Sequence, residues 1–355
     1  MRKLRVAIVG QGRSGYGIHG HFFASDANDV AEVVAAVDRL EVRRRLAEER
    51  YGCPVLADYR ELFGREDIDL VVNATMSMDH AAVTRELLNH GFNVLVEKPF
   101  AETEEECRAL MALAREKGKV LAVFQQSLFA PDFLTVKEII QSGKLGELVE
   151  ISIHYAGFAR RWDWQTLQSF TAGSLYNTGP HPVGQALDLL DWDKEAKVVY
   201  SNLRCAITSG DAEDYAKVLL TAPGKPLVHI NLTATDAFGE PNFKVQGSCG
   251  TLVVKGKEWE LKWLDPAALP PRPVCREPLA GEDGKPVYCK ETLPWQTERG
   301  TIEGTAFDAG TYRFYHMLAD TLLEGKELEI CPEYAARTVG VIQEVHRQNP
   351  LEIKF

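Results

Sequence analysis

The stretch that decides the fold is Val6-Ala7-Ile8-Val9-Gly10-Gln11-Gly12-Arg13-Ser14-Gly15. Four apolar residues, typical of a buried parallel strand, are followed by three glycines in the spacing G-x-G-x-x-G. In dinucleotide-binding folds the first glycine permits a tight turn, the second lets the backbone approach a pyrophosphate, and the third lets helix and strand pack closely. The N–H groups of Arg13, Ser14 and Gly15 would then face phosphate at the start of a helix. The stretch therefore predicts a cofactor-binding strand, turn and helix.

A carboxylate downstream strengthens this interpretation, because glycine turns between strand and helix are common. Asp38 closes the apolar run 33–37, about two dozen residues after Gly12, where a carboxylate that binds ribose hydroxyls is expected. Asp38 favours NAD, since a 2′-phosphate would meet a like charge. Arg39 can instead pair with that phosphate, so NADP stays possible, and an exposed first-turn role for Arg39 is an equal alternative.

The first third of the chain alternates short apolar runs with amphipathic stretches, which predicts an α/β domain with a doubly wound parallel sheet. We expect a Rossmann domain over residues 1–125. The expected strands are 4–9, 33–37, 70–74, 93–96 and 120–124, and the expected helices are 20–25, 42–51, 81–90 and 104–117.

After Gln125 the apolar period changes to two, which predicts an α+β domain over 126–355 with a large, open, mostly antiparallel sheet. A Pro- and Gly-rich stretch without a period, 266–294, is expected to be a surface excursion. The expected strands are 148–155, 198–206, 216–221, 227–233, 243–246 and 251–254, and the expected helices are 132–142, 311–324 and 332–347.

Composition excludes several classes of partner. The net charge of -11 offers no attraction for nucleic acid or an anionic membrane, and the basic run 43–45 is flanked by glutamates, as on a solvated helix face. Seven cysteines without a C-x-x-C pair indicate neither a disulfide framework nor a zinc site, so we expect no metal. With no signal peptide and no long apolar run, the expected location is the cytoplasm.

A lysine marks the expected reacting centre. Glu97-Lys98-Pro99 follows the strand 93–96, and ligands of open α/β sheets bind beyond the carboxyl ends of the strands. Lys98 would therefore project its ammonium toward the nicotinamide end of the cofactor. The alternative is an ordinary solvated lysine.

These motifs together resemble the glucose–fructose oxidoreductase / inositol dehydrogenase / rhizopine-catabolism (Gfo/Idh/MocA) family over essentially the whole chain. The matching positions are Gly10, Gly12, Gly15, His19, Asp38, Thr75, His80, Glu97, Lys98 and Pro99. The resemblance implies NAD(P)-dependent oxidation or reduction of sugars and polyols, and it puts Thr75, His80 and Glu97 near the cofactor. It also implies a homo-oligomer, a dimer or tetramer, formed through the C-terminal sheet.

The family's second signature, G-G-x-x-x-D-x-G-x-H-x-x-D, is similar to residues 172–184 but with Asn177 and Gly184 in place of its aspartates. Oxidation of an alcohol needs a group that takes the hydroxyl proton, and the retained His181 is the candidate. Lys98 would stabilise charge on the substrate oxygen. Asn177 can orient a hydroxyl or the ring but supplies no charge, so we expect His181 to act as a neutral base. The alternative for His181 is a satisfied core histidine.

The expected substrate pocket combines aromatic planes with polar groups, as carbohydrate recognition requires. Its candidates are Gln126, Tyr155, Arg161, Trp164, Asn177 and His181. The alternative for the tryptophans is a cluster that fills the domain junction. Gln125 and Gln126 stand where relatives often carry an arginine pair, which favours a substrate less anionic than a sugar acid.

Three functions fit these residues. The first is a dehydrogenase or reductase of a sugar, inositol or related polyol. The second is an NAD-requiring glycosidase or lyase that works by transient oxidation and shows no net NADH. The third is a regulator of the same fold that binds the dinucleotide without chemistry.

Overall fold

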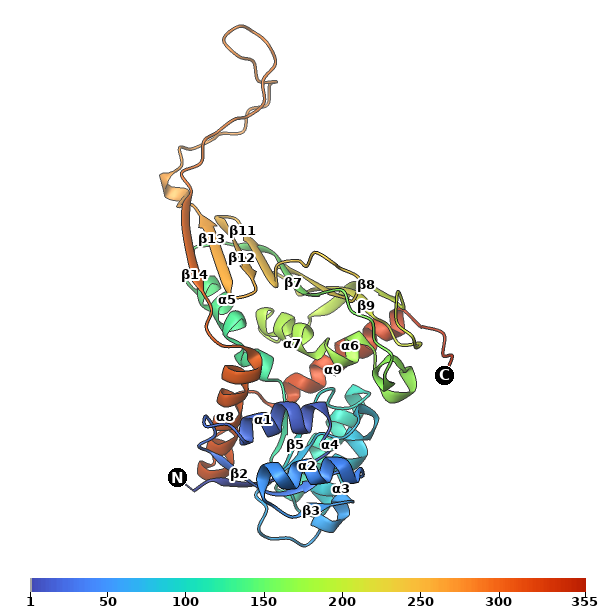
Figure 1. The fold of residues 1–355 in the computed structure, drawn as a ribbon. Helices are drawn as coiled ribbons and strands as arrows, with labels where there is room; N and C mark the ends of the chain where they lie inside the picture. The colour runs from blue at the N-terminus through green and yellow to red at the C-terminus, as the bar shows by residue number, and fades with distance from the viewer. Residues whose placement is uncertain (1) are drawn as a thin grey trace.

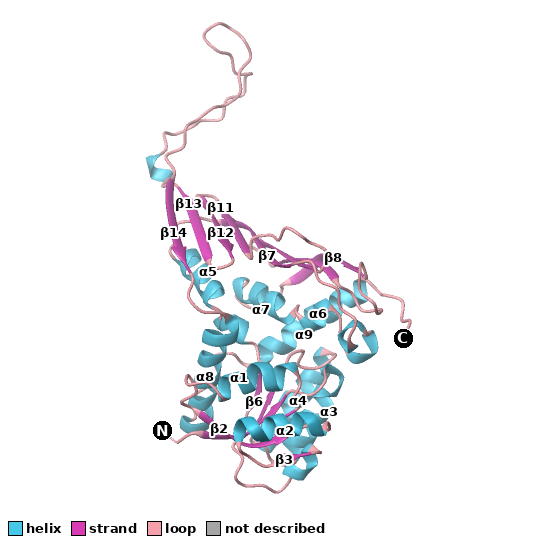
Figure 2. Ribbon diagram, viewed as in Figure 1, coloured by secondary structure: helices cyan, strands magenta, loops and turns pink. Residues whose placement is uncertain are grey.

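The computed structural model describes residues 2–355 and contains two sheets, one in each half of the molecule (Figures 1 and 2). The first sheet has six parallel strands in the order β3-β2-β1-β4-β5-β6. The strands are β1 (Leu4–Val9), β2 (Ala31–Val37), β3 (Val55–Leu56), β4 (Leu70–Asn73), β5 (Val94–Val96) and β6 (Leu121–Val123). This order confirms the predicted doubly wound sheet. The two-residue β3 was not predicted.

Helices join these parallel strands and bury the central ones. All residues of β4, β5 and β6 are buried, as expected where both faces of a parallel sheet are covered. The helices are α1 (Gly20–Phe23), α2 (Glu41–Tyr51), α3 (His80–Asn89) and α4 (Glu104–Lys117). A wider turn of π type, Gly15–His19, precedes α1, and the helical segment begins before it, at Arg13, well ahead of the predicted residue 20.

The second sheet has eight strands in the order β14-β13-β12-β11-β7-β10-β9-β8. Neighbours are antiparallel except β7 and β10, which run parallel. Alternate residues of β9 and β10 are buried, which confirms the predicted period of two. The strands are β7 (Leu148–Ala156), β8 (Lys197–Arg204), β9 (Tyr215–Thr221), β10 (Leu227–Thr233), β11 (Phe243–Gly247), β12 (Gly250–Lys255), β13 (Glu258–Trp263) and β14 (Gln296–Thr301).

Helices between the two sheets connect them. The helices α6 and α7 contact β10, and α9 contacts both β8 of the second sheet and β6 of the first (Figure 1). The C-terminal part of the chain therefore helps to hold the two sheets in place. The helices of this half are α5 (Pro131–Gln141), α6 (Ser174–Asn177), α7 (Pro180–Leu189), α8 (Thr311–Glu324) and α9 (Pro332–Gln348).

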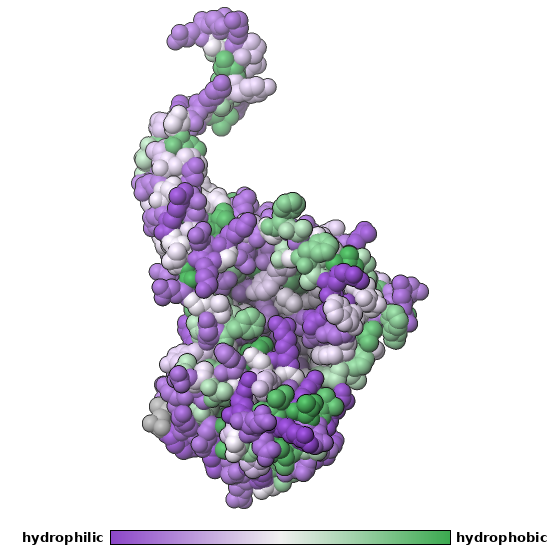
Figure 3. Space-filling model, in the orientation of Figure 1, coloured by the Kyte–Doolittle hydropathy of each residue, from purple (hydrophilic) through white to green (hydrophobic). Residues whose placement is uncertain are grey.

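Residues 264–295 form an arm that extends from the edge of the second sheet, between β13 and β14 (Figure 1). Within the arm, Arg272 pairs with Glu291, and Val287 N–H donates to the Leu279 carbonyl. Val274 and Tyr288 are 90% exposed, while the tip is mainly hydrophilic (Figure 3). The arm agrees with the predicted surface excursion. Over residues 2–355, none of the helices has the length and apolar character needed to span a membrane.

Candidate functional site

The glycine turn is close-packed at two of its three glycines. Gly10 has φ +91°, and a Cβ there would lie 2.3 Å from the Ala74 carbonyl oxygen. A Cβ at Gly15 would lie 1.8 Å from the Gly10 carbonyl oxygen. At Gly12 the nearest atom to such a Cβ is the Arg43 guanidinium, 3.8 Å away. A Cβ at Gly12 would therefore meet the end of the flexible Arg43 side chain and no backbone atom, which fits the approach of a pyrophosphate. Arg13 and Ser14 follow at the helix start.

Asp38 holds this turn and the start of α2 together. Its carboxylate accepts hydrogen bonds from Gln11 N–H and Leu40 N–H, both at 2.8 Å. Although 6% exposed, it stands at the end of β2 beside the glycine turn. A carboxylate fixed in this way is suited to accept ribose hydroxyls as well.

The basic run 43–45 lies on α2, and two of its arginines contact Asp38 from there. Arg43 Nη1 lies 3.5 Å from Asp38 Oδ2, and Arg44 Nη1 donates to the Asp38 carbonyl at 2.8 Å. Arg43 and Arg45 are exposed, as predicted for a solvated helix face, and Arg45 pairs with Glu41 there. Arg39 is exposed, which agrees with the alternative that it is an exposed residue of the first helical turn. Arg43 follows Asp38 by five residues, and this spacing is the sequence feature that could have predicted the contact between them.

Thr75 and His80 form one hydrogen-bonded unit at the end of β4. Thr75 Oγ1 donates to Asn73 Oδ1 at 2.7 Å, and Asn73 Nδ2 donates to the His80 carbonyl at 3.1 Å. The His80 ring contacts the Pro99 carbonyl through Nδ1 at 2.7 Å. Burial lowers the pKa of His80, so the ring is neutral at neutral pH. This unit braces the loop after β5 against the loop after β4.

Glu97 is buried directly before Lys98 in the chain. Its Oε1 lies 3.1 Å from His19 Nε2, and its Oε2 accepts the Lys98 N–H at 3.0 Å. The other His19 nitrogen, Nδ1, lies 2.7 Å from the hydroxyl of Tyr315 on α8. Burial alone would raise the pKa of Glu97, but the His19 hydrogen bond and the charges of His19 and Lys98 hold it at about 2.

Lys98 joins the two halves of the molecule. It follows β5 of the first sheet, and its Nζ donates to the Asn177 carbonyl at 2.7 Å, at the end of α6. Burial lowers the pKa of Lys98, Glu97 opposes that shift, and the charges of Arg13 and Arg161 add to it. The ammonium is half-buried and thus constrained, unlike that of an ordinary solvated lysine.

His181 lies close enough to Lys98 for their charges to interact. Burial and, secondly, the Lys98 charge lower the pKa of His181 to about 3. The ring is therefore neutral at neutral pH, in line with a base that starts unprotonated. His181 Nδ1 contacts the Ser127 hydroxyl at 2.9 Å, and the Tyr155 ring lies parallel to it at 6.5 Å.

Asn177 presents its main chain to Lys98 and its side chain to Gln165. Gln165 Nε2 donates to Asn177 Oδ1 at 3.2 Å. That bond orients the amide with its NH2 group on the other side, where it can donate to an oxygen. The second signature position, Gly184, lies against the Gln125 amide, 3.2 Å from where a Cβ would be. The Gln125 side chain thus occupies the space beside the missing second aspartate.

The remaining substrate candidates lie at different depths. Gln126 is buried, and its Oε1 has no hydrogen-bond partner among residues 2–355. Arg161 pairs with Asp163 at 2.8 Å, and its charge reaches Lys98. Trp164 is half-buried and packs at 6.1 Å from Phe170, whereas Trp162 is 80% exposed, so the two do not form a buried tryptophan cluster. Tyr155 lies parallel to the His181 ring, and the Asn177 carbonyl accepts the Lys98 hydrogen bond.

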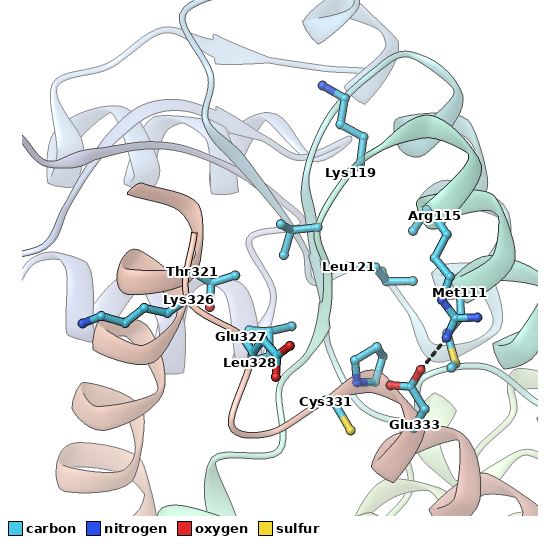
Figure 4. A pocket seen from close by; sticks show the side chains of 13 residues that line it. Met111, Arg115, Lys119, Leu121, Thr321, Lys326, Glu327, Leu328, Cys331 and Glu333 are labelled. Carbon is cyan, nitrogen blue, oxygen red and sulfur yellow. Dashed lines mark hydrogen bonds and ion pairs between the residues drawn. The ribbon is translucent and has the colours of Figure 1, made fainter. Parts of the chain in front are cut away.

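A separate pocket of about 370 Å³ lies at the opposite end of the first sheet (Figure 4). It is bounded by the start of β6, the end of α4 and the segment that joins α8 to α9. Arg115 and Glu333 pair across it at 2.5 Å. Because cofactors of such sheets bind at the carboxyl ends of the strands, this pocket is not part of the candidate site.

Two family sequence models match the chain. Residues 4–125 match the model described as an oxidoreductase family with an NAD-binding Rossmann fold, named GFO_IDH_MocA. Residues 133–253 match the GFO/IDH/MocA C-terminal domain. The glycine turn and Asp38 thus belong to an NAD-binding domain, as predicted.

Curated relatives and solved structures agree with that match. The chain is 28% identical over 255 residues to the uncharacterized oxidoreductase YdgJ of Escherichia coli, covering 71% of each chain. It is 23% identical over 343 residues to the NADP-dependent scyllo-inositol 2-dehydrogenase IolW of Bacillus subtilis, covering 96% of this chain and 92% of the relative. An NAD-binding protein from Listeria innocua has the same fold, with a TM-score of 0.81, 24% identity and 100% of both chains covered.

Proposed function

This chain belongs to the GFO/IDH/MocA oxidoreductase family, and from that premise we propose that it transfers hydride between nicotinamide and a sugar, inositol or related polyol. The observation that carries the proposal is the 2.7 Å hydrogen bond from Lys98 Nζ to the Asn177 carbonyl. It ties the carboxyl end of β5 to the segment that leads into α7 and His181. An ammonium and an imidazole from different halves of the chain are thereby near each other.

The cofactor would be held by the turn Gly10–Gly15 and by Asp38. Gly12 leaves room for the pyrophosphate, and Asp38 is fixed at the position that suits the ribose. The nicotinamide, when bound, supplies the hydride acceptor or donor. Thr75, His80 and Glu97 support the loops around this end of the sheet through their hydrogen bonds.

His181 and Lys98 divide the work on the substrate hydroxyl. The neutral imidazole accepts the hydroxyl proton at Nε2, because Nδ1 already contacts Ser127. Lys98 donates a hydrogen bond to the same oxygen and stabilises its developing negative charge. The NH2 group of Asn177, oriented by Gln165, donates to a neighbouring substrate oxygen.

The test is turnover with NAD and with NADP against a panel of sugars, inositols and glycosides, following both reduced cofactor and product. Appearance of reduced cofactor supports the dehydrogenase. Product without net reduced cofactor would favour the glycosidase or lyase. Binding of NAD without either would favour the regulator and overturn the proposal.

Variants of the two polar groups refine this test. Lys98→Met and His181→Gln are expected to lower kcat by about 10²- to 10⁴-fold while the Kd for NAD changes only a few-fold. His21→Gln, an exposed histidine on α1, is the matched control and should keep full activity. Full activity in either of the first two variants would contradict the assigned roles.

We also propose that a second copy of the chain covers the outer face of the eight-stranded sheet. Within the described chain, the helices that contact this sheet, among them α5, α6, α7 and α9, lie on its other side (Figure 1). An antiparallel sheet usually has one face packed on the core, and its other face is a surface that a second copy can cover. Light scattering coupled to size-exclusion chromatography should give a dimer or tetramer mass, and a monomer would contradict this proposal.

A further inference from the structure

We infer that Ser127 is a positioning residue for His181, holding the imidazole in the tautomer whose proton is on Nδ1 and whose lone pair on Nε2 faces the substrate. The inference rests on the proposed function, which makes His181 the base. The contact itself is seen in the structure: Ser127 Oγ lies 2.9 Å from His181 Nδ1, and Ser127 is 3% exposed. A neutral hydroxyl thus occupies the hydrogen-bonding position beside the ring.

Ser127 is itself fixed by its neighbours. Its carbonyl accepts a hydrogen bond from Gln185 Nε2 at 3.2 Å, and Gln185 Oε1 accepts one from the Tyr155 hydroxyl at 3.4 Å. His181 and Gln185 are four residues apart on α7, so their side chains lie on the same face of the helix. Both therefore contact Ser127, one through its hydroxyl and the other through its carbonyl.

Asn177 does not take this role. Its side-chain oxygen accepts from Gln165, and its main-chain oxygen accepts from Lys98. Within residues 2–355, Ser127 is the residue hydrogen-bonded to the His181 ring. Asn177, which replaces the first aspartate of the signature, thus directs its amide oxygen to Gln165. The His181 ring is bonded instead by Ser127, a residue outside the signature.

The role of base decides which tautomer the hydroxyl has to support. An imidazole that accepts a proton at Nε2 must carry its own proton on Nδ1. The Ser127 hydroxyl, able to donate or accept, then accepts from Nδ1–H. A hydroxyl carries no charge, so it orients the ring without favouring the imidazolium. A carboxylate in the same place would favour the imidazolium. Ser127 therefore sets the tautomer of the base, while burial and the charge of Lys98 disfavour its protonation.

The experiment is histidine-labelled ¹⁵N NMR of the full-length protein between pH 5 and 8, with the His181 signals assigned by their loss in His181→Gln. In the wild type, Nδ1 is expected to be protonated and Nε2 unprotonated across this range. Ser127→Ala should shift the tautomer ratio about 2- to 10-fold toward Nε2–H, as expected for loss of one neutral hydrogen bond. Ser127→Thr, which keeps the hydroxyl, should restore the wild-type ratio.

Ser152→Ala is the matched control, because Ser152 is a buried serine whose hydroxyl bonds Glu150 on β7 and not His181. It should leave the His181 tautomer unchanged. An unchanged ratio in Ser127→Ala, or a wild type protonated on Nε2, would overturn the inference whatever the substrate panel shows. Conversely, a panel without turnover would overturn the proposed function while the NMR result stands.

Once the panel has identified a substrate, kinetics give a second measurement. Ser127→Ala should lower kcat with little change in KM or in the Kd for NAD, and Ser127→Thr should recover much of the loss. Equal falls in kcat and in cofactor affinity would indicate a general structural defect instead and would contradict a positioning role.

Discussion

Replacing Glu97 with glutamine tests whether an ionised, buried carboxylate stabilises the site. The pKa of Glu97 is about 2, against an ordinary value of 4.5. A depressed pKa in the folded chain means that the stabilising contribution is complete above the unfolded pKa and is lost as the pH falls from about 4.5 toward 2. At about 1.4 kcal/mol per pKa unit, a difference of about 2.5 corresponds to on the order of 3 kcal/mol at pH 7.

Urea unfolding of the full-length wild type and of Glu97→Gln at several pH values measures this contribution. The difference in unfolding free energy should be about 3 kcal/mol at pH 7 and about 2 kcal/mol at pH 3.5. Glu86→Gln is the control, since Glu86 pairs with Arg60 at the surface, where such pairs contribute up to about 1 kcal/mol. The reasoning is refuted if Glu97→Gln lowers the unfolding free energy no more than Glu86→Gln does. It is also refuted if Glu97→Gln lowers that free energy equally at both pH values.

Three further predictions concern the cofactor loop and the arm. Arg43→Ala should weaken NADP binding about fivefold more than NAD binding, by titration calorimetry, whereas Arg45→Ala should alter neither; equal effects would contradict the position of Arg43. Gly15→Ala should weaken NAD binding at least about tenfold, because its Cβ would meet the Gly10 carbonyl, and Gly17→Ala, with open space around it, should not. Deleting 270–290 should change Tm by less than about 2 °C in a thermal melt, and a larger fall would show that the arm packs on the body.

Much of the fold was predictable because its pattern is local. The helix 104–117 and the strand 227–233 agree with the structure at both ends. The helix 311–324 ends as predicted, but the helical segment begins five residues earlier, with the π turn Ala306–Gly310 that Thr305 caps. The strand β13 was not predicted, although Trp259, Leu261 and Trp263 alternate with charged residues in the period-two pattern of a strand. Its partner β14, Gln296–Thr301, is polar throughout and is a strand only because β13 pairs with it.

The candidate site was predictable where a motif sets the spacing and unpredictable where contacts are made in space. Gly10, Asp38 and Lys98 lie at fixed points relative to strands, so their positions followed from the sequence. Ser127 is 54 residues from His181, and no periodicity relates the two.

The contact of Tyr315 with His19 bears on how the chain is made. Tyr315 stacks on Phe22 at 4.9 Å and hydrogen-bonds the histidine that holds Glu97. During synthesis the ribosome completes residue 125 about 190 residues before it reaches Tyr315. Until then the emerging N-terminal half has an unsupported histidine and uncovered phenylalanines, so its cofactor end becomes complete only when the last part of the protein has been translated.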